Sequence, residues 1–381
     1  MSSPTTGKTA TGPGSSDVLR QLGLAGGGGL SDEHVAMSPR EAAGLAQDLW
    51  RLDVVDADRF ATEKDDTFRL SCRSGRSVVV KVSHPGEHAE QVDFETALLH
   101  HVSQGPSPVP VPELLPSRHD TLLETVVDSA GQRRIARVMT CLDGTPLDSV
   151  GSDAKQREQV GEMLAHLRHA TANFSHPQAS RLYAWNVEIL PYLEPLLGAV
   201  ADPGHRARLA SGLERFDEVV TPKLGGLRRQ VLHNDFSTSN LLVEPADPAF
   251  VTGVLDFGDA VETAIAVDVS TAMLNQLPRD CGQNMPSDIF AAGRDVLRGY
   301  LRHAELTDEE LAVIPHLVMG RVVARALITS YRARQVPGNT AYILRNTEQG
   351  WGQLEWFLRR SPDEIAATLT TTATADTEQT R

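Results

Sequence analysis

The sequence predicts an α+β protein with two lobes, a small β-rich lobe followed by a larger helical one. Two patterns support this prediction: runs of β-branched residues dominate the chain up to about residue 140, and apolar residues at helical spacing dominate the rest. A length of 381 residues suits two lobes around a cleft. The segment 141–147, which contains glycine and proline, is the expected hinge. We therefore expect an N-lobe over residues 31–140 and a C-lobe over residues 141–361.

The N-lobe is expected to contain a β-sheet and one helix. Its first two strands are β-branched runs separated by a short turn, which is typical of a hairpin, with Gly75 at the turn. The following segment has apolar side chains at helical spacing and ends at a proline cluster. A second pair of strands completes the lobe. The expected elements cover residues 67–72, 77–83, 87–102, 121–127 and 134–140.

The C-lobe is expected to be helical around one short β segment. A helix is predicted near residues 153–172, where apolar side chains recur on one face. Two short apolar runs, 241–243 and 251–255, flank a turn rich in proline and aspartate and predict a second hairpin. Most of residues 264–360 follows the pattern of amphipathic helices.

Both ends of the chain are expected to be disordered. Residues 1–30 are rich in Ser, Thr and Gly, and residues 362–381 are rich in Thr, so neither segment offers much apolar surface. The N-terminus lacks the apolar stretch of a secretory signal, and the absence of a run of 18 apolar residues predicts no transmembrane helix. The three cysteines (Cys72, Cys141 and Cys281) are too far apart for a disulfide framework and are expected to be free thiols. We therefore expect a cytoplasmic protein.

The formal net charge of -14 restricts the classes of partner. A negative surface repels nucleic acid and anionic membranes, so neither is expected as a partner. The same charge favours a cationic small molecule, although an acidic surface more often serves only to keep a protein soluble. Composition leaves the oligomeric state open.

Six polar residues occur in the order that phosphoryl transfer from ATP uses in kinases. A lysine stands inside an apolar strand, and a glutamate follows 14 residues later on a predicted helix. A polar loop and a strand ending in Asp-Phe-Gly come after them. Each feature alone is a weak signal, but their order and the strand–loop–strand context are specific. The six residues are Lys81, Glu95, His233, Asp235, Asn240 and Asp256.

The polar loop and the strand after it carry the expected chemistry. A carboxylate such as Asp235 can orient an attacking hydroxyl and accept its proton. Mg²⁺, which neutralises the phosphates, takes oxygen ligands and retains several waters. Asn240 offers an amide oxygen and Asp256 a carboxylate, and the predicted hairpin between them brings the two together. His233 is expected to stiffen the loop through hydrogen bonds.

Lys81 is the candidate for binding the α- and β-phosphates. The chain has only five lysines against 31 arginines, and a lysine in an apolar strand must reach water or be held by a carboxylate. Glu95 is the expected holder, with Glu90 as a competitor. The alternative is a solvent-facing lysine and an unrelated glutamate.

These motifs make the chain similar to the aminoglycoside phosphotransferase and choline kinase family, the small-molecule branch of the protein-kinase-like fold. The matching pieces lie within about residues 50–360 and include VVVKVSHPGE, LHNDFSTSNLLV and VTGVLDFGDA. The resemblance implies the protein-kinase-like two-lobed fold with its active site in the cleft, ATP or GTP as phosphoryl donor, and Mg²⁺. The family more often has glycine at the position of Asn234, a position without a chemical role. The turn 63–67 lacks the glycine-rich loop of protein kinases, which is usual in this family.

The resemblance also assigns the nucleotide site and a branch of the family. It implies that Thr67, Met139 and Cys141 contact the nucleotide, together with Lys81 and Glu95. The segments EKDDTFRL and FGDAVETAIAVDVSTAML resemble the hydroxylysine kinase-like branch, whose members phosphorylate hydroxyl groups of amino acids or amino alcohols.

The acceptor is expected over Asp235, between the loop 256–262 and the C-terminal helices. Asp259 and Glu262 could bind an ammonium group of the acceptor, or Asp259 could merely cap the loop. Arg321 and Arg325 lie one helical turn apart and could meet a carboxylate of the acceptor, or they could lie on a solvated helix face.

The leading hypothesis is an enzyme that transfers the γ-phosphoryl group of ATP or GTP to a hydroxyl of a small amine-bearing metabolite. One alternative is an antibiotic-resistance enzyme that phosphorylates an aminoglycoside or a related cationic drug. A second alternative is a pseudokinase without turnover, which the intact set of key residues argues against. A protein kinase is less favoured, because no Ala-Pro-Glu segment or activation loop follows Asp256.

Overall fold

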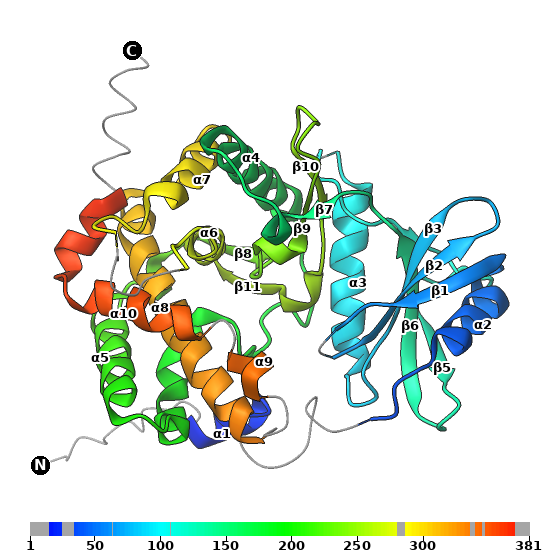
Figure 1. The fold of residues 1–381 in the computed structure, drawn as a ribbon, viewed down its shortest axis with the longest axis horizontal. Coiled ribbons are helices and arrows are strands. Elements are labelled where there is room, and N and C mark those ends of the chain that lie inside the picture. The colour runs from blue at the N-terminus through cyan, green and yellow to red at the C-terminus, as the bar shows by residue number, and fades with distance from the viewer. Residues whose placement is uncertain are drawn as a thin grey trace, which may run out of the picture.

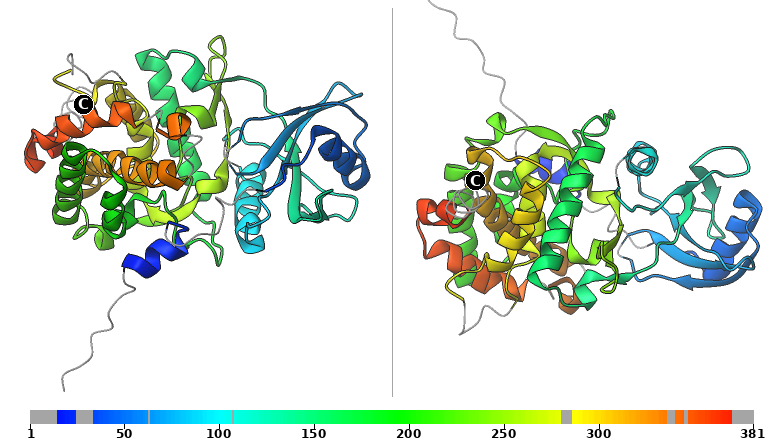
Figure 2. Two further views of the ribbon diagram at one scale, coloured as in Figure 1. Left: turned by 60° about the horizontal axis from the view of Figure 1, so that its bottom comes forward. Right: turned by 90° about the horizontal axis from the view of Figure 1, so that it is seen from above.

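The computed structural model describes residues 15–24, 34–62, 64–106, 108–279, 286–335, 340–344 and 347–369. The chain forms two lobes, with the β-sheet lobe on the right and the larger helical lobe on the left of Figure 1. Figure 2 shows the same separation from two further directions. The architecture is the two-lobed α+β arrangement that the sequence predicts.

The small lobe is an antiparallel sheet with one helix on each face. The strand order is β1-β2-β3-β6-β4, and β5 also pairs with β6. Helix α2 covers the outer face, and α3 lies between the sheet and the helical lobe (Figure 1). The elements are α2 (Pro39–Trp50), β1 (Val54–Arg59), β2 (Asp66–Cys72), β3 (Ser77–Val82), α3 (Ala89–Gln104), β4 (Leu114–Leu115), β5 (Glu124–Val127) and β6 (Arg133–Thr140).

Alternation along β3 decides which side chains face the helical lobe. Val78, Val80 and Val82 are fully buried in a core that includes residues of α2, so they point to the outer face. Because successive strand residues point to opposite faces, Val79 and Lys81 point to the other side. The predicted hairpin between β2 and β3 is confirmed, and Gly75 in its turn has a φ of +82°, which a side chain rarely adopts.

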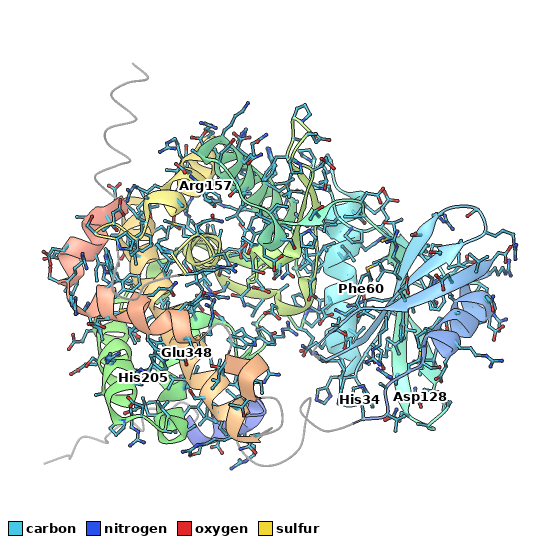
Figure 3. All side chains as sticks on the ribbon, in the orientation of Figure 1. His34, Phe60, Asp128, Arg157, His205 and Glu348 are labelled. Carbon is cyan, nitrogen blue, oxygen red and sulfur yellow. The ribbon has the colours of Figure 1, made fainter. Side chains whose placement is uncertain are left out.

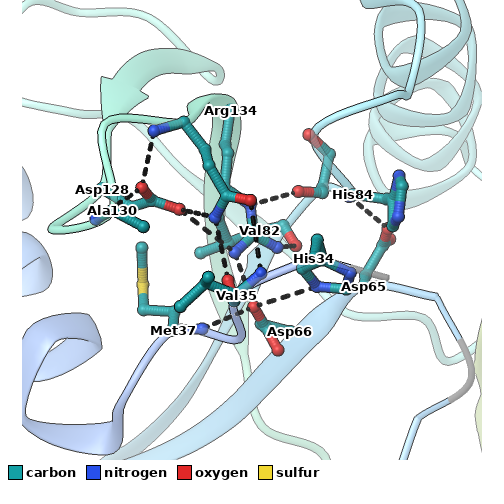
Figure 4. Close-up of polar contacts among 12 residues, drawn as sticks. His34, Val35, Met37, Asp65, Asp66, Val82, His84, Asp128, Ala130 and Arg134 are labelled. Atoms are coloured by element: carbon teal, nitrogen blue, oxygen red, sulfur yellow. Dashed lines mark hydrogen bonds and ion pairs between the residues drawn. The ribbon is translucent and has the colours of Figure 1, made fainter. Parts of the chain in front are cut away.

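A buried ion pair fixes the start of β2 (Figure 4). Arg134 donates from Nη1 to Asp66 Oδ2 at 2.6 Å and from Nε to the carbonyl of Ser83 at 2.6 Å. Met37 donates its backbone N–H to the same Asp66 oxygen at 2.9 Å. Both charged side chains are fully buried, and their multiple hydrogen bonds offset the cost of desolvation. The network therefore holds the residue before Asp66, which is Asp65, in a defined place.

The helical lobe packs its helices around a continuous apolar core. The side chain of Arg157, labelled in Figure 3, joins α4 to α7 by donating to Asp295 at 2.6 Å. On α5, His205 stacks on Trp351 of α10 with ring centroids 3.7 Å apart. The helices are α4 (Ala154–Thr171), α5 (Pro203–Val219), α6 (Ile265–Leu274), α7 (Ala291–Leu301), α8 (Asp308–Gln335), α9 (Thr340–Leu344) and α10 (Glu348–Leu358), with a long 3₁₀ segment η2 (Val187–Ala199).

Two small antiparallel sheets lie among the helices of the larger lobe (Figure 1). One has the order β10-β9-β7 and the other pairs β11 with β8. The hairpin predicted over 241–243 and 251–255 is confirmed as β9 and β10. The strands and short 3₁₀ turns are β7 (Thr145–Pro146), η1 (Leu147–Ser149), η3 (Leu224–Gly226), β8 (Arg229–Leu232), η4 (Thr238–Asn240), β9 (Leu241–Val243), β10 (Val251–Val254), η5 (Phe257–Asp259) and β11 (Val261–Ala264).

The structure differs from the expectation at both ends of the chain. Within the expected N-terminal arm, α1 (Ser15–Gln21) is helical and buries Val18 and Leu19. Within the expected C-terminal tail, residues 362–369 are helical, and Ile365 and Leu369 are fully buried. A few apolar side chains on one face suffice to dock a short helix on a large lobe. Residues 1–14, 25–30 and 370–381 of the two predicted segments lie outside the described residues, as does Cys281.

Among the residues that the structure describes, α8 is the one helix long and apolar enough to cross a membrane. Of its most apolar stretch, 83% is buried inside the protein. Figure 1 shows α8 running through the helical lobe with α6 and α10 beside it. Its apolar character is therefore that of a core helix.

Candidate active site

Lys81 joins the two lobes. Its Nζ lies 3.3 Å from Asp256 Oδ1 in the helical lobe and 3.3 Å from Asp65 Oδ2 in its own lobe. Burial alone would lower the pKa of Lys81, but the two carboxylates outweigh it and raise the pKa. Lys81 in turn lowers the pKa of Asp256 to about 2. The pair is therefore charged at neutral pH.

Glu95 does not hold Lys81, contrary to the sequence-based expectation. Arg137 donates from Nη2 to Glu95 Oε2 at 2.8 Å and from Nη1 to Thr96 Oγ1 at 2.8 Å. Arg137 stands directly opposite Lys81 in the register of β3 and β6, so it reaches α3 from the same face of the sheet. The negative charge of Glu95 helps to raise the pKa of Lys81, but the two side chains form no ion pair.

The loop after β8 is fixed by hydrogen bonds from several elements. His233 bonds through Nε2 to the carbonyl of Leu255 at 2.9 Å, as expected for a stiffening role. Asn234 donates its backbone N–H to Asp268 Oδ1 of α6 at 2.8 Å. From α8, Arg321 donates to the carbonyl of Asn234 at 3.0 Å. These contacts hold the loop, and with it Asp235, in one conformation.

Two residues of the site, Asn234 in this loop and Asp256 after β10, have a positive φ. Asn234 has a φ of +62°, which glycine adopts more easily and which Asn tolerates better than most residues. Asp256, after β10, has a φ of +59°. Its side chain accepts a hydrogen bond from the backbone N–H of Gly258 at 3.4 Å.

Asp235 and Asn240 touch each other. Asn240 Nδ2 donates to Asp235 Oδ2 at 2.7 Å and to the Asp235 carbonyl at 3.0 Å. The Asn240 carbonyl accepts the backbone N–H of Leu255 at 2.8 Å, which places Asn240 beside the start of the Asp256 segment. Because the side-chain nitrogen of Asn240 binds Asp235, its side-chain oxygen points away from Asp235 and can serve as a ligand. The structure thus brings together Lys81, Asp235, Asn240 and Asp256.

The donor set at this point suits Mg²⁺. Asn240 can offer an amide oxygen and Asp256 a carboxylate, and both are the hard ligands that Mg²⁺ prefers. The described residues contain no group of three or more His, Cys, Asp or Glu side chains that could enclose a metal by itself. A Mg²⁺ ion held by two protein ligands would complete its shell with phosphate oxygens and water.

The residues expected to contact the nucleotide lie in or next to strands β2 and β6 of the sheet lobe. Thr67 stands opposite Lys81 in the register of β2 and β3, and its hydroxyl is buried without a hydrogen-bond partner. Met139 is mostly buried near the end of β6. Cys141 follows this strand, and its backbone N–H donates to the Ser77 carbonyl at 3.4 Å.

Asp259, in the 3₁₀ turn η5, is close to Asp235. Tyr183 donates its hydroxyl hydrogen to Asp259 Oδ1 in a short hydrogen bond. Burial, followed by the nearby charge of Asp235, raises the pKa of Asp259 to about 7. The Asp259 carbonyl accepts from Asn234 Nδ2 at 3.2 Å, so the residue also braces the loop. Asp259 is thus a buried acid beside the candidate base.

The other two residues expected at the acceptor lie in different surroundings. Glu262 is in β11, where its backbone N–H donates to Ala179 and its carbonyl accepts from Arg229. No described contact joins its side chain to Asp235. The side chain of Arg321 is not on a solvated face, because it binds the loop at Asn234 and the carbonyl of Trp185.

Several site residues escaped the sequence analysis. Asp268 is a buried acid in the apolar helix α6. A buried acid needs hydrogen-bond partners, so an aspartate inside this apolar segment of the sequence could have indicated its contact with the loop. Asp65 binds Lys81 and Arg137 binds Glu95 because of how the strands pair, and strand register cannot be derived from the sequence. Tyr183 lies in an irregular segment and had no local signal.

The sheet lobe, the fixed loop and the lysine–aspartate pair across the cleft define an enzyme of the kinase-like class. The phosphotransferase enzyme family model (APH) matches residues 59–306, and the chain belongs to this family. Hydroxylysine kinase of Mus musculus is 22% identical over 337 residues, which cover 83% of this chain and 88% of the relative.

Two solved structures show the same fold. A microcompartment-associated aminopropanol kinase aligns with a TM-score of 0.62 at 18% identity and covers 82% of this chain and 95% of its own. An amicoumacin kinase in complex with AMP-PNP, Ca²⁺ and Ami aligns with a TM-score of 0.59 at 17% identity and covers 88% of this chain and 92% of its own. The protein is therefore a small-molecule kinase.

Proposed function

We propose that the protein transfers the γ-phosphoryl group of ATP to a hydroxyl group of a small amine-bearing metabolite, of the hydroxylysine or amino-alcohol kind. The observation that carries the proposal is the meeting of Lys81, Asp256, Asn240 and Asp235, which come from both lobes. Asp235 orients the hydroxyl and accepts its proton as the phosphoryl group transfers.

The metal belongs to this proposal. Asn240 and Asp256 would hold Mg²⁺, which supplies positive charge against the phosphates when bound. Lys81 binds the α- and β-phosphates, and in that state it exchanges Asp65 for phosphate oxygens. Glu95 serves the site through Arg137, which shares the same face of the sheet.

The amine in the acceptor is supported by Asp259. Its carboxylate lies beside Asp235, and a negatively charged group there suits an ammonium group of the acceptor. The name of the mouse relative, hydroxylysine kinase, describes an acceptor with both a hydroxyl and an amine. The same acids would suit an aminoglycoside, which is the second candidate. A cytoplasmic location is part of the proposal, because ATP is available there and Cys72 and Cys141 are free thiols.

A coupled assay of ADP release tests the proposal. The purified protein is incubated with Mg-ATP and with hydroxyamino acids, amino alcohols, aminoglycosides or hydroxy acids without an amine in turn. We expect turnover with members of the first or second set. Turnover only with aminoglycosides would select the second candidate, and turnover only with acceptors that lack an amine would contradict the assignment of Asp259.

A further inference from the structure

Helix α8 presents two arginines to the catalytic loop. Arg321 and Arg325 are four residues apart, so their side chains lie on one face of the helix, one turn from each other. Arg321 contacts the loop at Asn234, next to Asp235. Arg325 therefore lies on the same side of α8, one turn further along the helix.

The two guanidinium groups differ in what they bind. Arg321 donates to the carbonyl and the side-chain oxygen of Asn234, at 3.0 and 3.3 Å, and to the carbonyl of Trp185 at 3.2 Å. The side chain of Arg325 makes no hydrogen bond or ion pair within the part of the chain that the structure describes. Its exposure is intermediate, so the guanidinium is recessed but reachable.

A recessed cation without a partner is unusual in this chain. Acidic residues outnumber Lys and Arg by 50 to 36, and most other recessed arginines bind a carboxylate or a carbonyl. Burial, followed by the neighbouring charge of Arg321, lowers the pKa of Arg325 to about 10. The group is still charged at neutral pH, and the protein leaves its five N–H donors unused.

Arg325 lies near Asp235 but is not bound to it. The charge of Asp235 acts on Arg325, so the two groups are within electrostatic range, yet they form no ion pair. Arg279 adds further positive charge on the side of Arg325. Asp259, in contrast, lies on the acidic side of the same site, against Tyr183. Groups of both signs therefore surround Asp235: Arg325 is a cation within its electrostatic range, and Asp259 is an acid whose pKa it raises.

We propose that Arg325 binds a carboxylate of the acceptor, so that the substrate is a hydroxylated amino acid rather than an amino alcohol or an aminoglycoside. The proposal rests on the proposed function and narrows its acceptor class. The acceptor's ammonium is held by Asp259 and its carboxylate by Arg325. An arginine suits this role because its planar fork matches the two oxygens of a carboxylate. Arg321 positions the loop and does not bind the acceptor.

Paired acceptors test the carboxylate directly. The wild-type protein is assayed with 5-hydroxylysine and with 5-hydroxylysine amide, which keeps the shape and the amines but loses the negative charge. We expect the acceptor KM to be about 10–150-fold higher for the amide, the usual effect of losing one charge-assisted hydrogen-bonding pair. The KM for ATP is expected to stay the same.

Variants assign the effect to one residue. Arg325→Met should raise the KM for 5-hydroxylysine by about 10–150-fold and remove the preference for the acid over the amide. Arg325→Lys keeps the positive charge but lacks the planar guanidinium group. It should therefore retain part of the preference for the acid over the amide that Arg325→Met loses. Arg334→Gln, in the exposed last turn of the same helix, is the matched control and should behave as wild type.

Thermal unfolding separates binding from a structural role. Because the side chain of Arg325 has no partner among the described residues, Arg325→Met should leave Tm unchanged or raise it. A lower Tm together with a raised KM for ATP would overturn the proposal and make Arg325 a structural residue.

The outcomes distinguish this proposal from the broader one. If the protein phosphorylates amino alcohols or the amide as well as the acid, Arg325 has no carboxylate to bind, and only the broader function stands. If it phosphorylates a hydroxy acid without an amine, such as 6-hydroxyhexanoate, as readily as 5-hydroxylysine, the amine assignment fails while the role of Arg325 stands. If it phosphorylates none of these acceptors, both proposals are wrong.

Discussion

Asp235 is the single residue on which the proposed reaction depends most directly. Its carboxylate is aligned by Asn240 Nδ2 at 2.7 Å, and its backbone is fixed through Asn234 and His233. A base held in this way needs no rearrangement to meet an incoming hydroxyl.

Asp235→Asn should reduce kcat by about 10²–10⁴-fold, because the amide cannot accept the proton. The affinity for Mg-ATP, measured by calorimetry, should stay close to that of wild type. Asp247→Asn, in the exposed turn between β9 and β10, is the control and should retain full activity. A kcat within tenfold of wild type in Asp235→Asn would show that another group takes the proton.

Acceptor binding should depend on pH through Asp259. Its pKa is raised to about 7 by burial and by Asp235, while Tyr183 and Arg321 act in the opposite direction. As pH falls from 8 to 6 the carboxylate gains a proton and loses its charge, so the acceptor KM should rise by up to about tenfold per pH unit below 7. The KM for ATP, measured in the same series, should change much less. Asp259→Asn should have a high acceptor KM with a flat profile over this range; a profile as steep as that of wild type would assign the titration to another group.

Among the elements, the crossing of α4 and α7 is the tightest contact. A Cβ atom at Gly299 would overlap the carbonyl of Glu158, and one at Gly161 would overlap the carbonyl of Val296. Both obstacles are helix backbone, which cannot move aside without separating the helices. Ion pairs then surround the crossing, such as Arg298 with Glu158 at 2.8 Å.

Gly299→Ala should therefore destabilise the protein by roughly 1–3 kcal/mol, the usual cost of overpacking, with a lower Tm in thermal unfolding. Gly44→Ala is the matched control, because Gly44 lies inside α2 with open space around it. There, alanine should stabilise by about 0.5–1 kcal/mol, because it favours the helix over the unfolded chain. Equal Tm values for the two variants would mean that α7 can shift away from α4.

Elements defined by local patterns could be predicted from the sequence, and those defined by partners could not. The hairpins around Gly75 and between β9 and β10 follow from short-range signals, and so does the order of the motif around Asp235. The pairing of Glu95 was predicted wrongly, because it depends on Arg137 standing beside Lys81 in the register. Helix α1 was missed because only a few apolar residues, such as Val18 and Leu19, anchor it to a lobe that the local sequence does not reveal. Arg321 binds the catalytic loop, whereas Arg325 has no partner among the described residues. The sequence cannot reveal this difference, because both residues are arginines on the same face of one helix.

At the scale of the whole molecule, the ion pair between Lys81 and Asp256 connects the lobes at the point where the nucleotide is proposed to bind. The two residues are 175 positions apart in the chain and 3.3 Å apart in space. A metal-bound nucleotide would replace this single contact with several contacts to both lobes. Nucleotide binding would therefore stabilise the arrangement in which the two lobes are close together.

Asp256→Ala should remove both the lobe contact and a proposed metal ligand. In wild type, Mg-ATP at 100 times its Kd should stabilise the fold by about 2.7 kcal/mol and raise Tm by several degrees. The variant should show no such shift, and its Tm with Mg-ATP should equal its Tm with ATP and EDTA. A variant that is still stabilised by Mg-ATP as much as wild type would place the metal on other residues.

The anchoring of the loop 233–240 also has an entropic consequence. Asp268 and Arg321 bind its backbone at Asn234, and the carbonyl of Leu255 binds the side chain of His233, so three separate segments hold the loop. Ordering a flexible backbone on binding costs about 1–2 kcal/mol per residue, and a loop that is already ordered avoids this cost. Nearly all of the free energy from contacts with the phosphates and the acceptor then contributes to binding affinity. A small polar substrate, which makes few contacts, can therefore stay bound long enough to react.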